Sequence, residues 1–386
     1  MKHTLFPLLL ALGMPLGAAS SAPQCKPVPA AVYDVPVVLL VDLSAGQTLY
    51  AHEAERRLLP ASITKAMSAL VAFDLIAAGK LSEDAAITVR PDTAARWSGR
   101  GTTLALRSGE QVKVRDLLMG LTTVSANDAA VALAEGALGS NEAWIAAMNA
   151  RAQRLGMSGS HFATANGFPD GGKTYVTARD LVRLAQALIT DHPALYQRYI
   201  GRKSMVWRGT ELFSHDPFAG GALAGADGIK TGHTYEAGFN FLGAVERDGR
   251  RLVLVIGGAQ NEDLRGKAAT GLAEWGYSAW DSRAFLGAGQ RIGSARVQNG
   301  DTRRVPLAVP RRFTLAVPKG FDAKVGARVV YRGPLRAPIA KGAQVAGLEV
   351  TIEGQPVHYL PLVAAETVDR AGPIDRIVNG LLGLVS

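Results

Sequence analysis

Residues 62–78 form a run that is apolar on nearly every face when it is drawn as a helix. Such a helix must be surrounded by other elements, so this segment predicts a large core with the helix inside it. The run follows Pro60 and begins with the hydroxyl of Ser62, and Lys65 comes three residues later. Residues i and i+3 share one face of a helix, so the serine and the lysine are expected to meet.

Ser62 and Lys65 have the chemistry of an activated nucleophile. A serine hydroxyl needs a base to take its proton, and a lysine can be that base when burial or a nearby cation lowers its pKa. The first turn of a helix also offers free N–H groups and a positive dipole end, which favour a developing oxyanion. The alternative is an N-cap serine followed by a lysine that extends to the surface. For a Ser-x-x-Lys motif alone, that alternative is favoured.

Two further motifs favour the nucleophile. Ser125-Ala126-Asn127 precedes a second apolar helix, and Lys230-Thr231-Gly232 lies where the pattern indicates the edge of a sheet. Ser-x-x-Lys, Ser-x-Asn and Lys-Thr-Gly each occur once, in this order. A closely similar set marks penicillin-binding proteins and class A β-lactamases. Together the three motifs predict a serine acyl-transfer enzyme.

The chain resembles the low-molecular-mass penicillin-binding proteins, specifically the D-alanyl-D-alanine carboxypeptidases, over about residues 30–386. The segments that carry the resemblance are LLPASITKAM, SANDAAVALAE, HFATANG, ARDLVRLAQALI and GIKTGHTYEAGFNFLG, in family order. The resemblance implies an α+β fold in which helices flank an antiparallel sheet, followed by a small all-β domain and a C-terminal amphipathic helix. It implies that the substrate is a peptidoglycan stem peptide ending in D-Ala-D-Ala. It also implies that β-lactams inhibit by acylating the serine.

The resemblance also implies catalytic roles for five residues of the motifs. Ser62 would attack the carbonyl of the terminal peptide bond, and Lys65 would accept its proton. Asn127 would hydrogen-bond the substrate amide and Lys65. Ser125 and Lys230 would pass a proton to the leaving D-alanine.

Four further residues are the substrate-binding residues that the resemblance implies: Thr231, Gly232, His233 and Arg265. The backbone N–H groups of Ser62 and His233 would form the oxyanion hole. Thr231 and Arg265 would bind the terminal carboxylate, for which an arginine fork is suited. Arg265 is expected in the loop GGAQNEDLRGK, which departs from the commoner family form GGRTFKGRE.

The strand patterns predict how the chain is organised. Residues 35–42 and 47–52 indicate one hairpin, and Asp248-Gly249 between two apolar runs indicates another. Helical patterns fill the stretch between, so residues 30–285 are expected to form an α+β domain whose sheet joins both of its ends. Short strands with Pro and Gly between them predict a small all-β domain over residues 288–370.

The two chain ends indicate export and membrane contact. Residues 1–22 have a basic start, a short apolar stretch broken by prolines and then small residues, which is typical of a signal peptide and predicts a periplasmic protein. A membrane span needs about 20 apolar residues, so this stretch is too short for one. Cys25 is given no role. Residues 372–386 place apolar side chains on one helical face, and this helix would lie on the inner membrane or pack on the β domain.

The charge distribution favours an anionic partner. The chain carries a net charge of +9, and residues 290–371 hold thirteen Lys or Arg but only six Asp or Glu. Such a surface suits a membrane face or an acidic wall polymer, although solvated arginines on strand faces explain it equally well. Nucleic acid is not expected for an exported chain. No metal or other cofactor is expected either, since the seven histidines lack ligand spacing.

Residues 167–174 formally fit the P-loop pattern G-x-x-x-x-G-K-[ST]. No apolar strand precedes them, and Thr177 indicates a helix that begins only after the pattern has ended. They are therefore interpreted as a loop near the rim of the active site, and no ATP binding is expected.

Three other functions remain as alternatives. A class A β-lactamase would need a Glu-x-x-Leu-Asn motif between the second and third triplets, and the only partial match, residues 236–240, comes after Lys230. An endopeptidase that cleaves cross-links is the second, but the Lys-Thr-Gly-His-Thr form of residues 230–234 favours a carboxypeptidase. A wall-binding or scaffold protein would rely on the basic β domain, but the intact motifs argue against it.

Overall fold

The computed structural model describes residues 26–372, except 220, 222, 321–323 and 353–356. The chain divides into two compact units, here called the first unit (residues 26–279) and the second unit (from residue 280). The expected signal peptide, Cys25 and the expected helix after Gly372 lie outside the described residues. Within the described part of the chain, no helix has the length and apolar character needed to cross a membrane.

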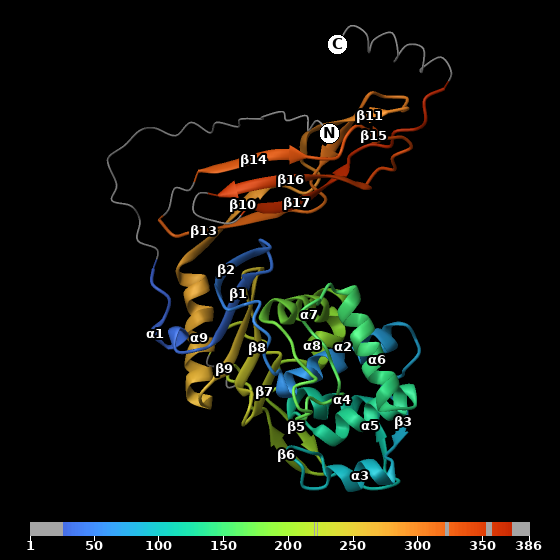
Figure 1. Cartoon of the computed structure of the whole chain (residues 1–386), viewed down its shortest axis with the longest axis vertical. Coiled ribbons are helices and arrows are strands. Elements are labelled where there is room, and N and C mark those ends of the chain that lie inside the picture. Colours follow the sequence, from blue (N-terminus) through green and yellow to red (C-terminus); the bar gives the residue numbers. More distant parts are fainter. Residues whose placement is uncertain (1–25, 220, 222, 321–323, 353–356, 373–386) are drawn as a thin grey trace. The chain divides into compact units, whose positions relative to one another are not determined.

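The first unit is built on a five-stranded antiparallel sheet with the order β2-β1-β9-β8-β7. Its strands are β1 (Val37–Asp42), β2 (Gln47–His52), β7 (Lys230–Thr234), β8 (Gly238–Arg247) and β9 (Arg250–Ala259). β1 pairs with β9, with Leu39 opposite Val255, so the sheet joins the two ends of the unit as the sequence predicts. β7 is an edge strand, which agrees with the expected position of Lys230-Thr231-Gly232 (Figure 1).

Helices cover both faces of this sheet. The remaining elements of the unit are α1 (Ala30–Tyr33), the 3₁₀ turn η1 (Ala61–Ile63), α2 (Thr64–Ala77), β3 (Ala86–Thr88), α3 (Pro91–Trp97), β4 (Gln111–Lys113), α4 (Val114–Thr123), α5 (Asn127–Leu138), α6 (Asn141–Arg154), α7 (Ala178–Asp191), α8 (Pro193–Tyr199), β5 (Ser204–Trp207), β6 (Thr210–Phe213) and α9 (Glu262–Ser278). α1 and α9 pack on one side, and α7 packs on the other (Figure 1). α2 contacts α4, α5, α6 and α7, and every residue from Thr64 to Phe73 is buried. The prediction of a central apolar helix is therefore confirmed.

Two local signals act as the sequence predicts. Asp248 and Gly249, between β8 and β9, have φ values of 51° and 73°, the left-handed pair that a two-residue hairpin turn requires. α7 begins after Thr177, whose side chain accepts a hydrogen bond from the N–H of Asp180 at 3.1 Å. This N-cap also places the helix start downstream of the P-loop-like pattern.

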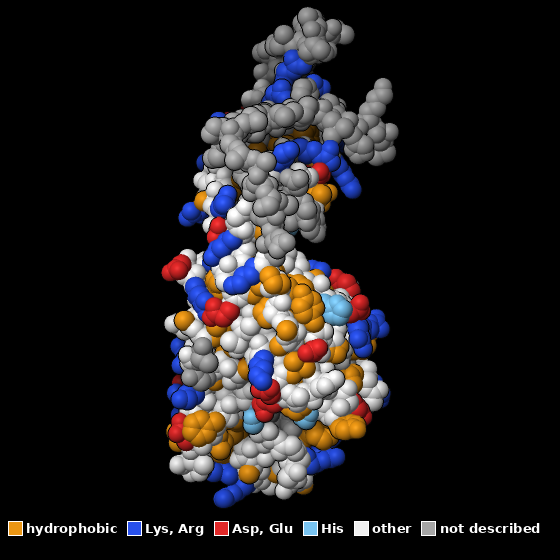
Figure 2. Space-filling model, turned by 90° about the vertical axis from the view of Figure 1, so that its left-hand side faces the viewer, with side chains coloured by type: hydrophobic (Ala, Val, Ile, Leu, Met, Phe, Trp, Pro, Cys, Tyr) orange, Lys and Arg blue, Asp and Glu red, His pale blue; other side chains and the backbone are white. Residues whose placement is uncertain are grey.

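The regular elements of the second unit, in the residues that the structure describes, are strands, as expected. They are β10 (Trp280–Leu286), β11 (Arg291–Gln298), β12 (Arg304–Ala308), β13 (Phe313–Pro318), β14 (Val325–Val330), β15 (Leu335–Arg336), β16 (Gln344–Ile352) and β17 (His358–Ala364). Six form one sheet in the order β14-β16-β17-β12-β11-β15, and β10 pairs with β13. β10 begins at Trp280, directly after α9, so the second unit starts before residue 285, where the first domain is expected to end. On the side that Figure 2 shows, Lys and Arg prevail over Asp and Glu on this unit.

Candidate active site

Ser62 lies in the 3₁₀ turn η1, which runs directly into α2, rather than in the first turn of an α-helix as the sequence predicts. Neither of these helices has a side-chain cap, so the alternative of an N-cap serine is wrong. The residue before it, Ala61, has a φ of 47°, which costs energy for an L-residue and tightens the turn. The turn leaves Ser62 half-buried on the wall of a cleft.

Lys65 is completely buried, and its Nζ is surrounded by oxygens. It donates to Ser62 Oγ at 2.8 Å, to Asn127 Oδ1 at 2.8 Å and to the carbonyl of Asn166 at 2.7 Å. Burial, reinforced by the charge of Lys230, holds the pKa of Lys65 well below its usual value. A neutral amine has two hydrogens and one lone pair. The Asn127 and Asn166 oxygens can take the hydrogens, which leaves the lone pair for the proton of Ser62.

The second motif forms the cleft wall that adjoins Lys65. Ser125 precedes α5 with a φ of 67°, and it is 8% exposed. Asn127 opens α5 and bridges two neighbours, because its Oδ1 accepts from Lys65 and its Nδ2 donates to the carbonyl of Arg100 at 3.2 Å. These two bonds fix the amide orientation of Asn127. Ser125 and Asn127 both line the cleft that Ser62 lines.

The third motif lies on the edge strand β7. Lys230 is 4% exposed, and burial lowers its pKa to about 7, an effect that Asp216 opposes and Arg265 strengthens. A Cβ on Gly232 would lie 2.3 Å from the carbonyl oxygen of Pro60. Only glycine therefore lets β7 approach the turn that carries Ser62, which explains this position of the motif.

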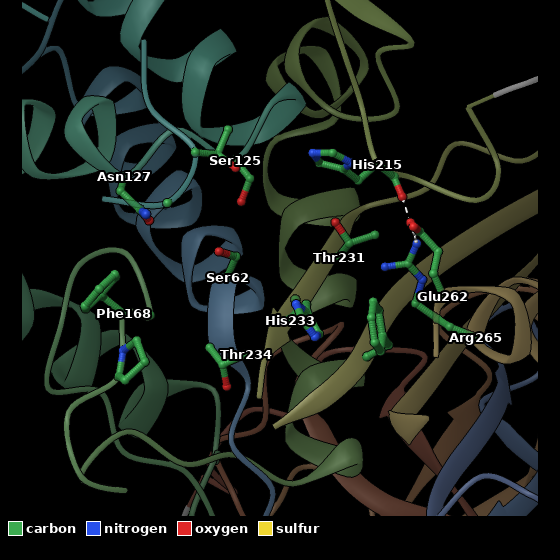
Figure 3. A pocket seen from close by; sticks show the side chains of 16 residues that line it. Ser62, Ser125, Asn127, Phe168, His215, Thr231, His233, Thr234, Glu262 and Arg265 are labelled. Carbon is green, nitrogen blue, oxygen red and sulfur yellow. Dashed lines mark hydrogen bonds and ion pairs between the residues drawn. The ribbon is translucent and has the colours of Figure 1, made fainter. Parts of the chain in front are cut away.

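The three motifs meet in one cleft of about 460 Å³. Its lining residues are Ser62, Gly101, Thr102, Ser125, Asn127, Gly167, Phe168, Pro169, His215, Thr231, Gly232, His233, Thr234, Phe239, Glu262 and Arg265. In Figure 3, Asn127 lies on one side of Ser62 and Arg265 on the other. Thr231 and His233 lie between Ser62 and Arg265. The ring of His233 stacks on Phe239, with their centroids 3.9 Å apart.

Arg265 lies in the first turn of α9, so the expectation that it sits in a loop is wrong. The helix begins after Asn261, whose Oδ1 accepts from the N–H of Leu264 at 2.8 Å. Arg265 is 3% exposed, and its Nη2 donates to the carbonyl of His215 at 3.0 Å and to Glu262 Oε1 at 2.6 Å. Its buried Nε has no hydrogen-bond partner among the described residues.

Sequence reasoning missed several residues of the site. Asn166 contributes through its backbone, and the nearest signal was Gly167, whose φ of 74° and close approach to Ala61 admit no side chain. Residues 167–169 line the cleft, so the interpretation of this segment as a loop at the active site is confirmed. His215 and Glu262 also line it, although no motif marks them. Among the described residues, no cluster of His, Cys, Asp or Glu is placed to hold a metal ion.

Comparisons with known proteins agree with this geometry. Residues 28–261 match the D-alanyl-D-alanine carboxypeptidase family, and residues 280–370 match the C-terminal domain of penicillin-binding protein 5. The chain belongs to the D-alanyl-D-alanine carboxypeptidase family. It is therefore a serine peptidase of the low-molecular-mass penicillin-binding group, as its motifs predict.

Relatives of known name cover most of the chain. It is 32% identical over 378 residues to the D-alanyl-D-alanine carboxypeptidase DacD of Salmonella typhimurium, an alignment covering 97% of this chain and 95% of the relative. DacA of Escherichia coli is 30% identical, with 90% and 86% covered. Penicillin-binding protein 5 of Haemophilus influenzae superposes with a TM-score of 0.78 at 27% identity, covering 91% of this chain and 100% of that one. The predicted order of an α+β peptidase fold followed by a β domain is confirmed.

Proposed function

We propose that Ser62 is the nucleophile with which this enzyme removes the terminal D-alanine from peptidoglycan stem pentapeptides. The observation that carries the proposal is the buried Lys65, hydrogen-bonded to Ser62 Oγ and held by Asn127 and Asn166. Burial and the charge of Lys230 lower the pKa of this lysine, which favours the neutral amine that can accept the serine proton. Its two carbonyl-type partners prevent the amine from turning away.

The reaction then proceeds through an acyl-enzyme. Ser62 Oγ attacks the carbonyl carbon of the D-Ala–D-Ala bond while its proton moves to Lys65 Nζ. The backbone N–H groups of Ser62 and His233 stabilise the oxyanion. The C–N bond breaks as Ser125 and Lys230 deliver a proton to the leaving amine, and D-alanine departs. Water then attacks the ester, which releases the shortened peptide and restores the Ser62 hydroxyl.

Substrate recognition rests on the other wall of the cleft. Thr231 and Arg265 would bind the terminal carboxylate, and Asn127 would hydrogen-bond the peptide amide. Arg265 suits this role because it is a fixed, buried cation whose Nε still lacks a partner among the described residues. Burial makes such a cation a strong anion site, since water competes poorly there. Gly232 and His233 would let the peptide run along the edge of β7.

β-Lactams are the expected inhibitors, because they imitate the D-Ala-D-Ala end. Penicillin-binding protein D2 of Listeria monocytogenes has been solved with ampicillin and with cefotaxime bound. The ampicillin-bound structure is 29% identical in sequence to this chain. That structure superposes with a TM-score of 0.56 and covers 64% of this chain and 98% of its own. The proposal extends to acylation of Ser62 by these drugs.

The test is D-alanine release from a peptide ending in Lys-D-Ala-D-Ala, together with labelling by a fluorescent penicillin. The wild-type protein should do both, and Ser62→Ala should do neither while unfolding at the same temperature. Ser98→Ala, at an exposed serine outside the cleft, should behave as wild type. Release of D-alanine by Ser62→Ala would refute the assignment of the nucleophile.

We further propose that the enzyme is exported to the periplasm and associates peripherally with the inner membrane through residues 372–386. Ala371 donates to the carbonyl of Asn299 at 2.9 Å, so the chain leaves the second unit beside the β11–β12 turn. On those strands, Arg296 and Arg304 lie directly opposite each other and are both exposed. Like charges in register are unfavourable, and an anionic lipid surface would offset the repulsion.

The membrane proposal predicts two separate effects. A chain that ends at Gly372 should stay active and leave the membrane fraction. Arg296→Glu with Arg304→Glu should weaken binding to vesicles with anionic lipid, whereas Arg311→Glu with Arg312→Glu, beyond the other end of β12, should have little effect. Membrane retention of the shortened chain would refute the anchor.

A further inference from the structure

The carboxylate of Glu262 is hydrogen-bonded to the guanidinium of Arg265, the group that the proposed function assigns to the substrate carboxylate. Glu262 Oε1 accepts from Arg265 Nη2 at 2.6 Å, and both residues line the cleft. Figure 3 shows the two side chains together at the end of the cleft, beneath the main chain of His215, whose carbonyl accepts from the same Nη2. An anion of the protein itself therefore already lies at the carboxylate subsite.

The two partners differ in their freedom to move. The side chain of Arg265 is 3% exposed, whereas that of Glu262 is 63% exposed. The guanidinium is thus held in place, while Glu262 can turn into water without losing packing. An incoming carboxylate that binds Arg265 must either replace Glu262 or lie beside its negative charge.

We propose that Glu262 is a specificity-determining residue, which weakens the binding of peptides with a free terminal carboxylate relative to peptides with a neutral C-terminus. This inference rests on the proposed role of Arg265. Its physical basis is competition in the unliganded enzyme and repulsion in the complex, and both act only on an anionic C-terminus. A neutral terminal amide meets no such repulsion.

A purely structural role for Glu262 has a matched control. Glu262 is the first residue of α9, where a negative charge stabilises the N-terminus of any helix. Asp263 is the next residue and serves the dipole equally well. It pairs with Lys267 at 2.7 Å, is 72% exposed and does not line the cleft. Glu262→Gln and Asp263→Asn therefore remove the same charge from the same helix turn, but only the first removes it from the subsite.

The experiment compares two peptides, N-acetylated Lys-D-Ala-D-Ala and its C-terminal amide, on the full-length enzyme. Turnover gives KM and kcat, and protection of Ser62 against a fluorescent penicillin gives the binding constant even for a peptide that is not cleaved. Glu262→Gln, which keeps an oxygen for Arg265, should lower KM for the acid about fivefold with kcat unchanged. That factor corresponds to two unit charges about 4 Å apart in water. Binding of the amide, and all values for Asp263→Asn, should stay at wild type.

Weaker binding of the acid by Glu262→Gln, or an equal change for both peptides, would overturn the inference. Either result would mean that Glu262 orients Arg265 instead of competing for it. Failure of the underlying function has a different signature. If Arg265→Ala leaves the ratio of acid to amide binding unchanged, then Arg265 does not bind the carboxylate, whatever Glu262→Gln does.

Discussion

Gly167→Ala should slow acylation of Ser62 far more than it destabilises the fold. A Cβ on Gly167 would lie 1.9 Å from the carbonyl oxygen of Ala61, the residue directly before the nucleophile. Contacts between a Cβ and another heavy atom are essentially never shorter than 3.0 Å, so the two segments must separate by about 1 Å. The same movement takes the carbonyl of Asn166 away from Lys65, to which it is bonded at 2.7 Å.

The effect of Gly167→Ala has two parts, the backbone strain of a left-handed alanine and the displacement caused by its Cβ. The same substitution at Gly171 measures the first part alone. Both glycines have left-handed backbones, with φ values of 74° and 70°, but a Cβ on Gly171 would meet nothing within 4 Å. Gly171→Ala should therefore cost only the backbone strain, about 1 kcal/mol, which corresponds to roughly 2–4 °C in Tm. Gly167→Ala adds the displacement, and a misplacement of about 1 Å at a reacting group costs on the order of a hundredfold in rate.

Stopped-flow acylation by a fluorescent penicillin, with thermal unfolding of each variant, measures both parts. Gly171→Ala should acylate at the wild-type rate, and Gly167→Ala about a hundredfold more slowly. A Gly167→Ala protein that acylates as fast as Gly171→Ala would refute the reasoning. It would mean that the loop yields away from the turn and that the position of Asn166 does not matter for the base.

Three other predictions concern single side chains. Asp216 raises the pKa of Lys230, which burial lowers to about 7. If Lys230 acts protonated, kcat/KM falls as the pH rises through this value. Asp216→Asn should move this fall in kcat/KM to lower pH, since the Lys230 ammonium loses a stabilising anion. An unchanged pH profile would show that Asp216 does not affect the pKa of Lys230. Asn240 is buried and bonds the carbonyl of Leu59 and the N–H of Gly258, so Asn240→Ala should cost about 2 kcal/mol in chemical denaturation and slow acylation. Thr177→Ala should cost about 1 kcal/mol through its lost N-cap and leave acylation unchanged, and a slower reaction would tie α7 to the site.

Much of the fold and of the site can be predicted because it depends on local sequence patterns. The alternation around Asp248-Gly249 specifies a hairpin, and the apolar run after Ser62 specifies a buried helix. The sequence also contains a start signal for α9, because Asn261 can cap a helix whose first turn holds Glu262 and Asp263, whereas the family resemblance predicts a loop here. There the resemblance to a family loop prevailed over a sound capping signal.

Other features of the site have no local signal. Asn166 acts through its carbonyl, which every residue possesses, so no residue type marks its role. Asp216 comes near Lys230 only through tertiary packing. Glu262 and Arg265, in contrast, are an i,i+3 pair that meets as soon as α9 forms, so their contact depends on the helix that the resemblance does not predict. The 3₁₀ turn at Ser62 depends on the positive φ of Ala61, which the amino-acid type does not favour.

The charges of the site follow one physical rule. Three cations, Lys65, Lys230 and Arg265, are almost fully buried, and burying an uncompensated charge is costly. Each is relieved in a different way. The pKa of Lys65 is lowered, because burial and its neighbour Lys230 outweigh Asp128, and this favours its neutral form. Burial lowers the pKa of Lys230 to about 7, and Asp216 opposes this shift. Arg265 stays charged and donates a hydrogen bond to the carboxylate of Glu262. Environments that push the pKa values of like groups apart separate their chemical roles, which supports one base, one proton donor and one anion site.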